Sequence, residues 1–178
     1  MTVVPHTVNR LVIEVAGSFD EFRARFEEAV PQIDPSAIPD FVERRAPWDE
    51  VVAAAAEAAP HGFLIYWTAA ATELMALAGD RGSCVSYLMG NHTIAERMYR
   101  HDPAVMLYAP LRAAIYADVD GRVRFSIDQP STVFDSFGTP EITEVGYELD
   151  KKIAALLTTL DVPVPDVLAP ANGDRSHE

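Results

Sequence analysis

Hydrophobic residues recur at helical spacing in a long segment near the end of the chain. From residue 142 onward they follow steps of three and four: Ile142, Val145, Leu149, Ile153, Leu156 and Leu160. Such a stripe is typical of an amphipathic helix whose apolar face packs on a core. Thr139, Pro140 and Glu141 are favourable residues for its start. We therefore predict a helix of about 20 residues, roughly 30 Å long.

Five shorter segments have the composition of β-strands, being rich in β-branched and aromatic residues and bounded by turn residues. They are residues 11–15, 63–68, 83–89, 111–117 and 122–127. The last two flank Asp118-Val119-Asp120-Gly121, where Asp-Gly between two apolar runs predicts a β-hairpin. We expect a two-residue loop there, at Val119-Asp120 or Asp120-Gly121.

Capping signals predict further helices. Ser18 with Glu21 forms a capping box ahead of several phenylalanines, and Thr93 with Glu96 forms a second one. Residues 31–60 read as a proline-rich loop followed by an extra helix from Pro47, and residues 72–78 as a short helix.

Strands do not alternate regularly with long helices in this order, and a hairpin is present. Both features favour an α+β fold with an antiparallel sheet covered by helices over a parallel, doubly wound fold. We predict a single domain over residues 1–165 and a flexible C-terminal tail over residues 166–178, where prolines and polar residues dominate.

The charge of the chain excludes some partners. The formal net charge is −13, with 27 acidic and 14 basic residues, so nucleic acids and anionic membrane surfaces would be repelled. Cys84 is the only cysteine, which rules out an intrachain disulfide and suggests a reducing compartment. The first ten residues lack the apolar core of a signal peptide. We therefore expect a cytoplasmic protein.

Arg112 is the most informative polar residue. In a strand it shares a face with Ala114 and Tyr116, and a two-residue hairpin loop would pair that face with apolar residues of the next strand. A guanidinium on an apolar face needs a partner. That partner is either the acidic group of a bound ligand or a carboxylate of the chain such as Asp102; alternatively, Arg112 reaches water at the strand end.

Two histidines and one aspartate are further candidates. His92 precedes a predicted helix start and could act as a general acid or base or as an axial metal ligand, or it is a surface histidine. His101, at the end of that helix, could bind haem, although the helix dipole alone explains it. Asp128 could be a catalytic carboxylate near Arg112 or could form a turn.

Aromatic and methionine side chains are frequent in the central strands and could line a pocket or form the core. This set comprises Tyr66, Trp67, Tyr87, Met89, Met98, Met106 and Tyr108. The sequence has no glycine-rich phosphate loop, no His-Glu-x-x-His and no Cys-x-x-Cys, so zinc and iron–sulfur sites of those kinds are not expected.

The stretch GNHTIAERMYRHDPAVMLYAPL, residues 90–111, resembles the signature of the bacterial DUF302 family. The matching residues are Asn91, Ala95, Asp102, Pro103, Val105, Leu107 and Pro110. The resemblance extends over roughly residues 8–160 and implies a curved antiparallel sheet with a long closing helix, as in half of a TATA-binding protein or a helix-grip fold. The family has no established activity. Three positions depart from its pattern: His92 replaces a proline, and Gly90 and Leu111 replace cysteines.

The leading hypothesis is a protein of unknown biochemical function that binds a small, partly apolar acidic molecule between the sheet and the C-terminal helix. Arg112 would anchor the acidic group, and Tyr87, Tyr116, Trp67 and Met89 would line the pocket, without a cofactor. Two alternatives stay open: a cofactor-independent enzyme using His92 and Asp128, and a haem- or metal-binding protein using His92 or His101. The sequence also leaves open whether the chain forms a homodimer.

Overall fold

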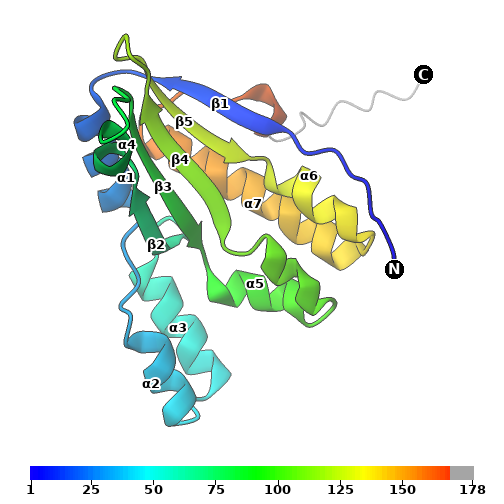
Figure 1. Ribbon diagram of the computed structural model, residues 1–178. Coiled ribbons are helices and arrows are strands. Elements are labelled where there is room, and N and C mark those ends of the chain that lie inside the picture. The colour runs from blue at the N-terminus through cyan, green and yellow to red at the C-terminus, as the bar shows by residue number, and fades with distance from the viewer. Residues whose placement is uncertain (169–178) are drawn as a thin grey trace.

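The computed structural model describes residues 1–168, which form an α+β domain around one five-stranded antiparallel sheet (Figure 1). The strands are β1 Arg10–Val15, β2 Leu64–Ala70, β3 Ser83–Gly90, β4 Leu111–Ala117 and β5 Val123–Asp128, in the order β1-β5-β4-β3-β2. The helices are α1 Phe19–Ala29, α2 Ala37–Glu43, α3 Trp48–Ala58, α4 Thr72–Ala76, α5 His92–Tyr99, α6 Pro130–Phe134 and α7 Pro140–Thr159, with 3-10 turns η1 Pro103–Leu107, η2 Asp135–Phe137 and η3 Asp166–Leu168.

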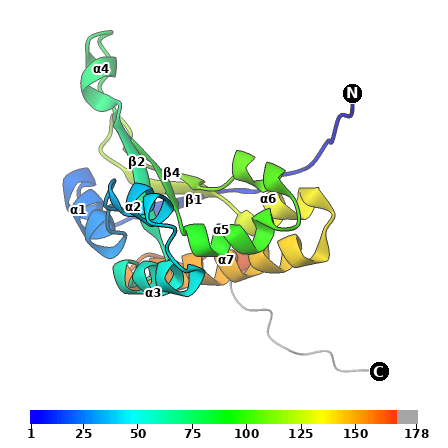
Figure 2. The same ribbon diagram turned by 90° about the horizontal axis from the view of Figure 1, so that it is seen from below.

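The sheet has one covered face and one open face. Side chains alternate along each strand between the two faces, so that in β4 Leu111, Ala113 and Ile115 are buried whereas Arg112 is exposed. Figure 2 shows α3, α5 and α7 on one side of the sheet, with α4 standing off on the other side. The face that packs on the helices is referred to below as the covered face, and its opposite as the open face.

Helix α7 closes the core as the sequence predicts. It has 20 residues, and all six positions of the hydrophobic stripe are buried. Phe22 and Phe26 of α1 join the same core beside Phe125 of β5. The expected antiparallel α+β architecture with a curved sheet and a long C-terminal helix is therefore confirmed. Within residues 1–168, no helix combines the length and the apolar character needed to cross a bilayer.

The first predicted capping box is present at the start of α1. The Ser18 hydroxyl accepts a hydrogen bond from the Glu21 backbone N–H at 3.3 Å, and the Glu21 carboxylate accepts one from the Ser18 N–H at 3.0 Å. We expect Ser18→Ala to lower the free energy of unfolding by about 1 kcal/mol, because the first turn loses an acceptor. Denaturant melts measure this loss, and a stability equal to that of the wild type would contradict it.

Three predicted boundaries are wrong. Asn91, not Thr93, caps α5: its side chain accepts from the Thr93 N–H at 2.9 Å, because α5 begins at His92. The proline-rich segment expected to be a loop contains α2. The packed domain does not end at residue 165, since Leu168 is buried in the core; the rest of the expected tail, residues 169–178, lies outside the described residues.

The hairpin between β4 and β5 has a longer connection than predicted. Ala117 pairs with Val123, so five residues form the loop. The Asp118 carboxylate accepts hydrogen bonds from the backbone N–H groups of Asp120 and Arg122, both at 3.0 Å. These bonds stabilise the wider turn. The change from two to five residues shifts the strand register by one, which moves every side chain of β4 to the opposite face relative to β5.

Candidate functional site

A small apolar pocket lies where the C-terminal end of β3 meets α5 and α7. Its free volume is about 70 Å³. Most of its lining comes from the signature segment 90–111, and Tyr66, Phe134 and Leu149 complete it from β2, α6 and α7. The lining is carbon-rich, with polar groups contributed by Tyr66, Asn91 and His92. Ligand sites commonly have this character, an apolar cavity with a few placed polar groups.

A β-bulge in β2 brings Tyr66 to this pocket. Ile65 pairs with Met89 on β3, but Trp67 pairs with the next residue, Leu88, so Tyr66 is the extra residue of the bulge. A bulge re-aims a side chain and reverses the facing of the strand beyond it. Ile65 is consequently buried on the covered face, whereas Trp67 is exposed on the open face.

Tyr66 holds His92 through two hydrogen bonds. The Tyr66 oxygen accepts from the His92 backbone N–H at 3.0 Å and lies 2.8 Å from His92 Nδ1. Burial raises the pKa of Tyr66 to about 12, so its hydroxyl keeps its proton at neutral pH. If the Tyr66 hydroxyl donates its proton to Nδ1 and accepts from the His92 backbone N–H, its proton and one of its lone pairs both have partners. If Nδ1–H donated instead, both the tyrosine proton and the Nε2 lone pair would lack partners. The tautomer with the proton on Nε2 leaves fewer hydrogen-bonding groups without partners, so we assign the imidazole proton to Nε2.

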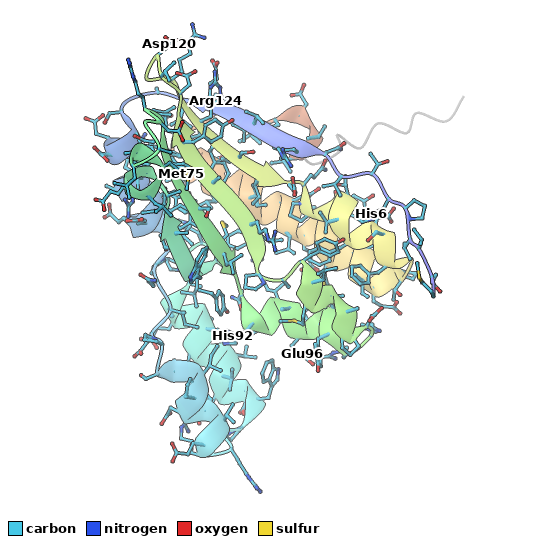
Figure 3. All side chains as sticks on the ribbon, in the orientation of Figure 1. His6, Met75, His92, Glu96, Asp120 and Arg124 are labelled. Carbon is cyan, nitrogen blue, oxygen red and sulfur yellow. The ribbon has the colours of Figure 1, made fainter. Side chains whose placement is uncertain are left out.

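The Nε2 atom of His92 is the notable polar atom of the site. It is buried, and no described residue forms a hydrogen bond with it. Burial also lowers the pKa of His92 below its usual value of 6.5, so the ring is neutral at neutral pH. Figure 3 shows His92 where the end of the sheet meets α5, with α3 below it. A buried N–H donor without a partner is costly, so this position calls for an acceptor from outside the described chain.

The lowered pKa of His92 makes stability depend on pH. The unfolded chain binds the His92 proton near pH 6.5, whereas the folded chain binds it only at lower pH. Folding therefore loses stability as the pH falls through 6.5 and on toward the lowered pKa. We expect His92→Gln to lose less stability than the wild type between about pH 7 and about pH 5. Denaturant melts at both pH values measure the difference, and identical pH slopes would contradict the account.

Ion pairing fixes α5 against α7 beside the pocket. Arg97 of α5 donates two hydrogen bonds to Glu148 of α7, at 2.6 and 2.8 Å, and Arg97 lowers the pKa of the Glu148 carboxyl. Met98 and Leu149, the next residue on each helix, both line the pocket. The Asn91 cap and this bidentate pair therefore hold two walls of the pocket in place.

The expected position of Arg112 on the apolar, covered face of the hairpin is wrong, whereas Asp128 does lie near it, since both line a second pocket. Arg112 pairs with Leu88 across the sheet and is exposed on the open face, where Trp67 is also exposed and Tyr116 is half-buried. The register shift in the β4–β5 hairpin is the reason, because it removes Arg112 from the face of Val123, Phe125 and Ile127. An internal salt bridge to Asp102 is not among the ion pairs of residues 1–168 either.

Tyr87 and Met89 lie on the covered face and belong to the core. The Tyr87 hydroxyl donates to Glu27 Oε1 of α1 at 2.9 Å, which satisfies it away from the pocket. Asp128 lies on the open face, 3.5 Å from Arg10, and His101 is exposed after α5. Of the predicted site residues, His92 alone lines the pocket beside the sheet end; whether the others bind a ligand stays a prediction.

The sequence places Tyr66 in the aromatic set but does not predict that Tyr66 is the hydrogen-bond partner of His92. No local signal marks the bulge, since residues 64–68 read as one continuous apolar strand. Asn91 belongs to the family signature, but the signature does not indicate that it caps α5. Within residues 1–168, no group of three or more histidine, cysteine, aspartate or glutamate side chains could hold a metal ion.

The fold and the pocket define a class: an α+β domain with an antiparallel sheet covered on one face by helices, and an apolar pocket at the end of the sheet. The family model described as domain of unknown function DUF302 matches residues 42–160, more than half of the chain. The chain belongs to the DUF302 family. Among curated proteins, none has a sequence that matches it.

The fold is similar to that of a solved member of the family. The crystal structure of an uncharacterized conserved DUF302 protein from Bacillus stearothermophilus aligns with a TM-score of 0.60 and 17% sequence identity. The match covers 85% of this chain and 97% of the other. Gly90 and Leu111, where the family resemblance led us to expect cysteines, both line the pocket of this chain. The signature segment of the family therefore encloses the pocket.

Proposed function

We propose that this protein binds a small, largely apolar molecule that carries one hydrogen-bond acceptor, in the pocket enclosed by residues 90–111. The observation that carries the proposal is the buried Nε2 atom of His92, which has no hydrogen-bond partner among the described residues. A ligand oxygen accepting from Nε2–H would satisfy this donor, and the apolar walls would cover the rest of the molecule.

The chemistry of the pocket favours a neutral ligand over the acidic one expected from the sequence. Arg112, the proposed anchor of an acidic group, lies on the open face and not in the pocket. His92 is neutral because burial lowers its pKa, so it offers a dipolar N–H and no full charge. A ketone, ester, ether or hydroxyl oxygen suits such a donor. A bare carboxylate would have to give up its water for a single neutral hydrogen bond.

Neither alternative function gains support from the site. A general base or an axial haem ligand at His92 would need an unprotonated Nε2, whereas the hydrogen bond from Tyr66 favours the tautomer with Nε2–H. The cavity of about 70 Å³ is also too small for a haem, and it restricts the proposed ligand to a small molecule. We therefore propose ligand binding without catalysis as the function of this site.

Titration with a small cyclic ketone and with the hydrocarbon of the same ring size tests the proposal. Cyclohexanone and cyclohexane, followed by NMR on the labelled full chain, are suitable probes. We expect both to shift signals of residues around the pocket, with the ketone binding more tightly. His92→Phe should weaken ketone binding about tenfold and leave hydrocarbon binding unchanged, because one hydrogen bond is lost.

A pair of matched variants locates the binding site. Ala95 lines the pocket, so Ala95→Met should fill it and abolish binding of both probes. Ala104 is exposed in η1 and does not line the pocket, so Ala104→Met is the control and should bind as the wild type does. Unchanged binding by Ala95→Met, or ketone binding that is insensitive to His92→Phe, would contradict the proposal.

A further inference from the structure

An arm of the molecule stands away from the core. Between β2 and β3, residues 71–82 carry the short helix α4, and they are called the α4 arm below. Figure 2 shows α4 projecting from the sheet on the side opposite α3, α5 and α7. Leu74, Met75 and Leu77 on this arm are 63%, 44% and 85% exposed. Three large apolar side chains this close together on a projecting segment indicate a surface that another molecule covers.

The open face of the sheet offers a matching surface. Trp67 on β2 is 53% exposed, and it lies in one row across the sheet with Leu88 and Arg112. The adjoining row consists of the small side chains Ala69, Ser86, Ala114 and Ser126 and ends at the exposed Val12 of β1, so the residues in the middle of the face do not hinder an approaching helix. Helices α3, α5 and α7 lie on the other side of the sheet from this row (Figure 2). The face thus combines an exposed aromatic side chain with room for contact.

The charges of the arm and of the open face are complementary. The open face carries three arginines, Arg10, Arg112 and Arg124, against Glu14 and Asp128, although acidic residues outnumber basic ones by 27 to 14 in the chain. Two of these arginines form ion pairs on the face itself, Arg10 with Asp128 at 3.5 Å and Arg124 with Glu14 at 3.8 Å. The arm carries Glu73 and Asp80 against Arg81. Arg112 has no ion-pair partner within residues 1–168. The unpaired positive charge of Arg112 on the face therefore complements the excess negative charge of the arm.

We infer that two copies of this chain form a twofold dimer in which the α4 arm of each copy lies on the open face of the other. A second copy is the occupant that the observations favour, because one chain supplies both complementary surfaces. A twofold rotation then covers both arms and both faces in one isologous interface. This inference goes beyond the proposed function, because the pocket beside His92 lies at the end of the sheet among α5, α6 and α7.

The oligomeric state of the full chain tests the dimer. We expect sedimentation equilibrium to give a dimer for the wild type at micromolar concentration. Leu77→Glu places a charge in the interface and should raise the dissociation constant at least about a hundredfold. Val42→Glu is the matched control, because Val42 is 72% exposed on α2, away from the arm. It should leave the dimer unchanged. A monomeric wild type would overturn the inference, whatever other molecule covers the face.

Mixing two variants tests the exchange of arms. Leu77→Glu damages the arm and Arg112→Glu damages the face, and both residues are exposed, so both variants should fold, as circular dichroism can verify. Each variant alone should be monomeric at micromolar concentration. The mixture should associate more tightly than either variant, because one intact arm then meets one intact face. No gain on mixing, or a dimer insensitive to both changes, would overturn the inference.

Discussion

Asp150→Ala is expected to lower the free energy of unfolding by about 3 kcal/mol, because it leaves buried hydrogen-bond donors without their acceptor. Asp150 is 4% exposed on the inner side of α7. Its carboxylate accepts from the Gln129 amide at 2.8 Å and from the Ser131 backbone N–H at 3.0 Å. These bonds tie α7 to the start of α6, where the first turn of a helix otherwise leaves its N–H groups unpaired.

Denaturant melts measure this loss, and Glu144→Ala is the matched control. Glu144 is an exposed acidic residue on the same helix, so its removal should change stability by less than about 0.5 kcal/mol. Asp150→Asn keeps the size and one acceptor and should fall between the two. If Asp150→Ala were as stable as Glu144→Ala, Asp150 would not hold the two helices together.

Gly146→Val is expected to lower the free energy of unfolding by about 3 kcal/mol, through overpacking between α6 and α7. A Cβ atom at Gly146 would lie 3.0 Å from Ser131 Cα, 3.3 Å from Phe134 Cβ and 3.4 Å from Pro130 O. Two of these three atoms belong to the backbone, so they cannot turn aside as a flexible side chain can. Only glycine allows the two helices to lie this close.

Two comparisons separate the close approach from helix propensity. Gly146→Ala should also destabilise, although alanine in an exposed helix is about 1 kcal/mol more favourable than glycine. Glu144→Val introduces the same branched side chain at an exposed position of α7 and should cost less than about 1 kcal/mol. A Gly146→Ala variant more stable than the wild type would show that α6 moves away readily.

The long helix and the strands were predictable because each depends on local periodicity. The α7 stripe buries all six predicted positions, and β4 spans residues 111–117 as expected. The face of Arg112 was not predictable, because it depends on whether the β4–β5 connection has two residues or five. The Asp118 carboxylate decides that length by binding two backbone N–H groups, and Asp-Gly signals alone do not reveal it.

The candidate site was predictable in part. The sequence predicts His92 at a strand-to-helix corner, and it does lie at the junction of β3 and α5. Its hydrogen bond to Tyr66 joins residues 26 positions apart and depends on the bulge in β2. Contacts between distant strands, and irregularities in their register, leave no trace in local patterning. The unpartnered Nε2 atom therefore emerges only from the folded chain.

The protonation state of the His92 ring, measured by nitrogen-15 NMR with and without cyclohexanone, tests the central claim most directly. The His92→Gln variant assigns the signals by their absence. The account predicts a proton on Nε2 and none on Nδ1 at neutral pH, and a shift of the Nε2 signal when the ketone is added. A proton on Nδ1 with a bare Nε2, and no response of either nitrogen to saturating ketone, would contradict it.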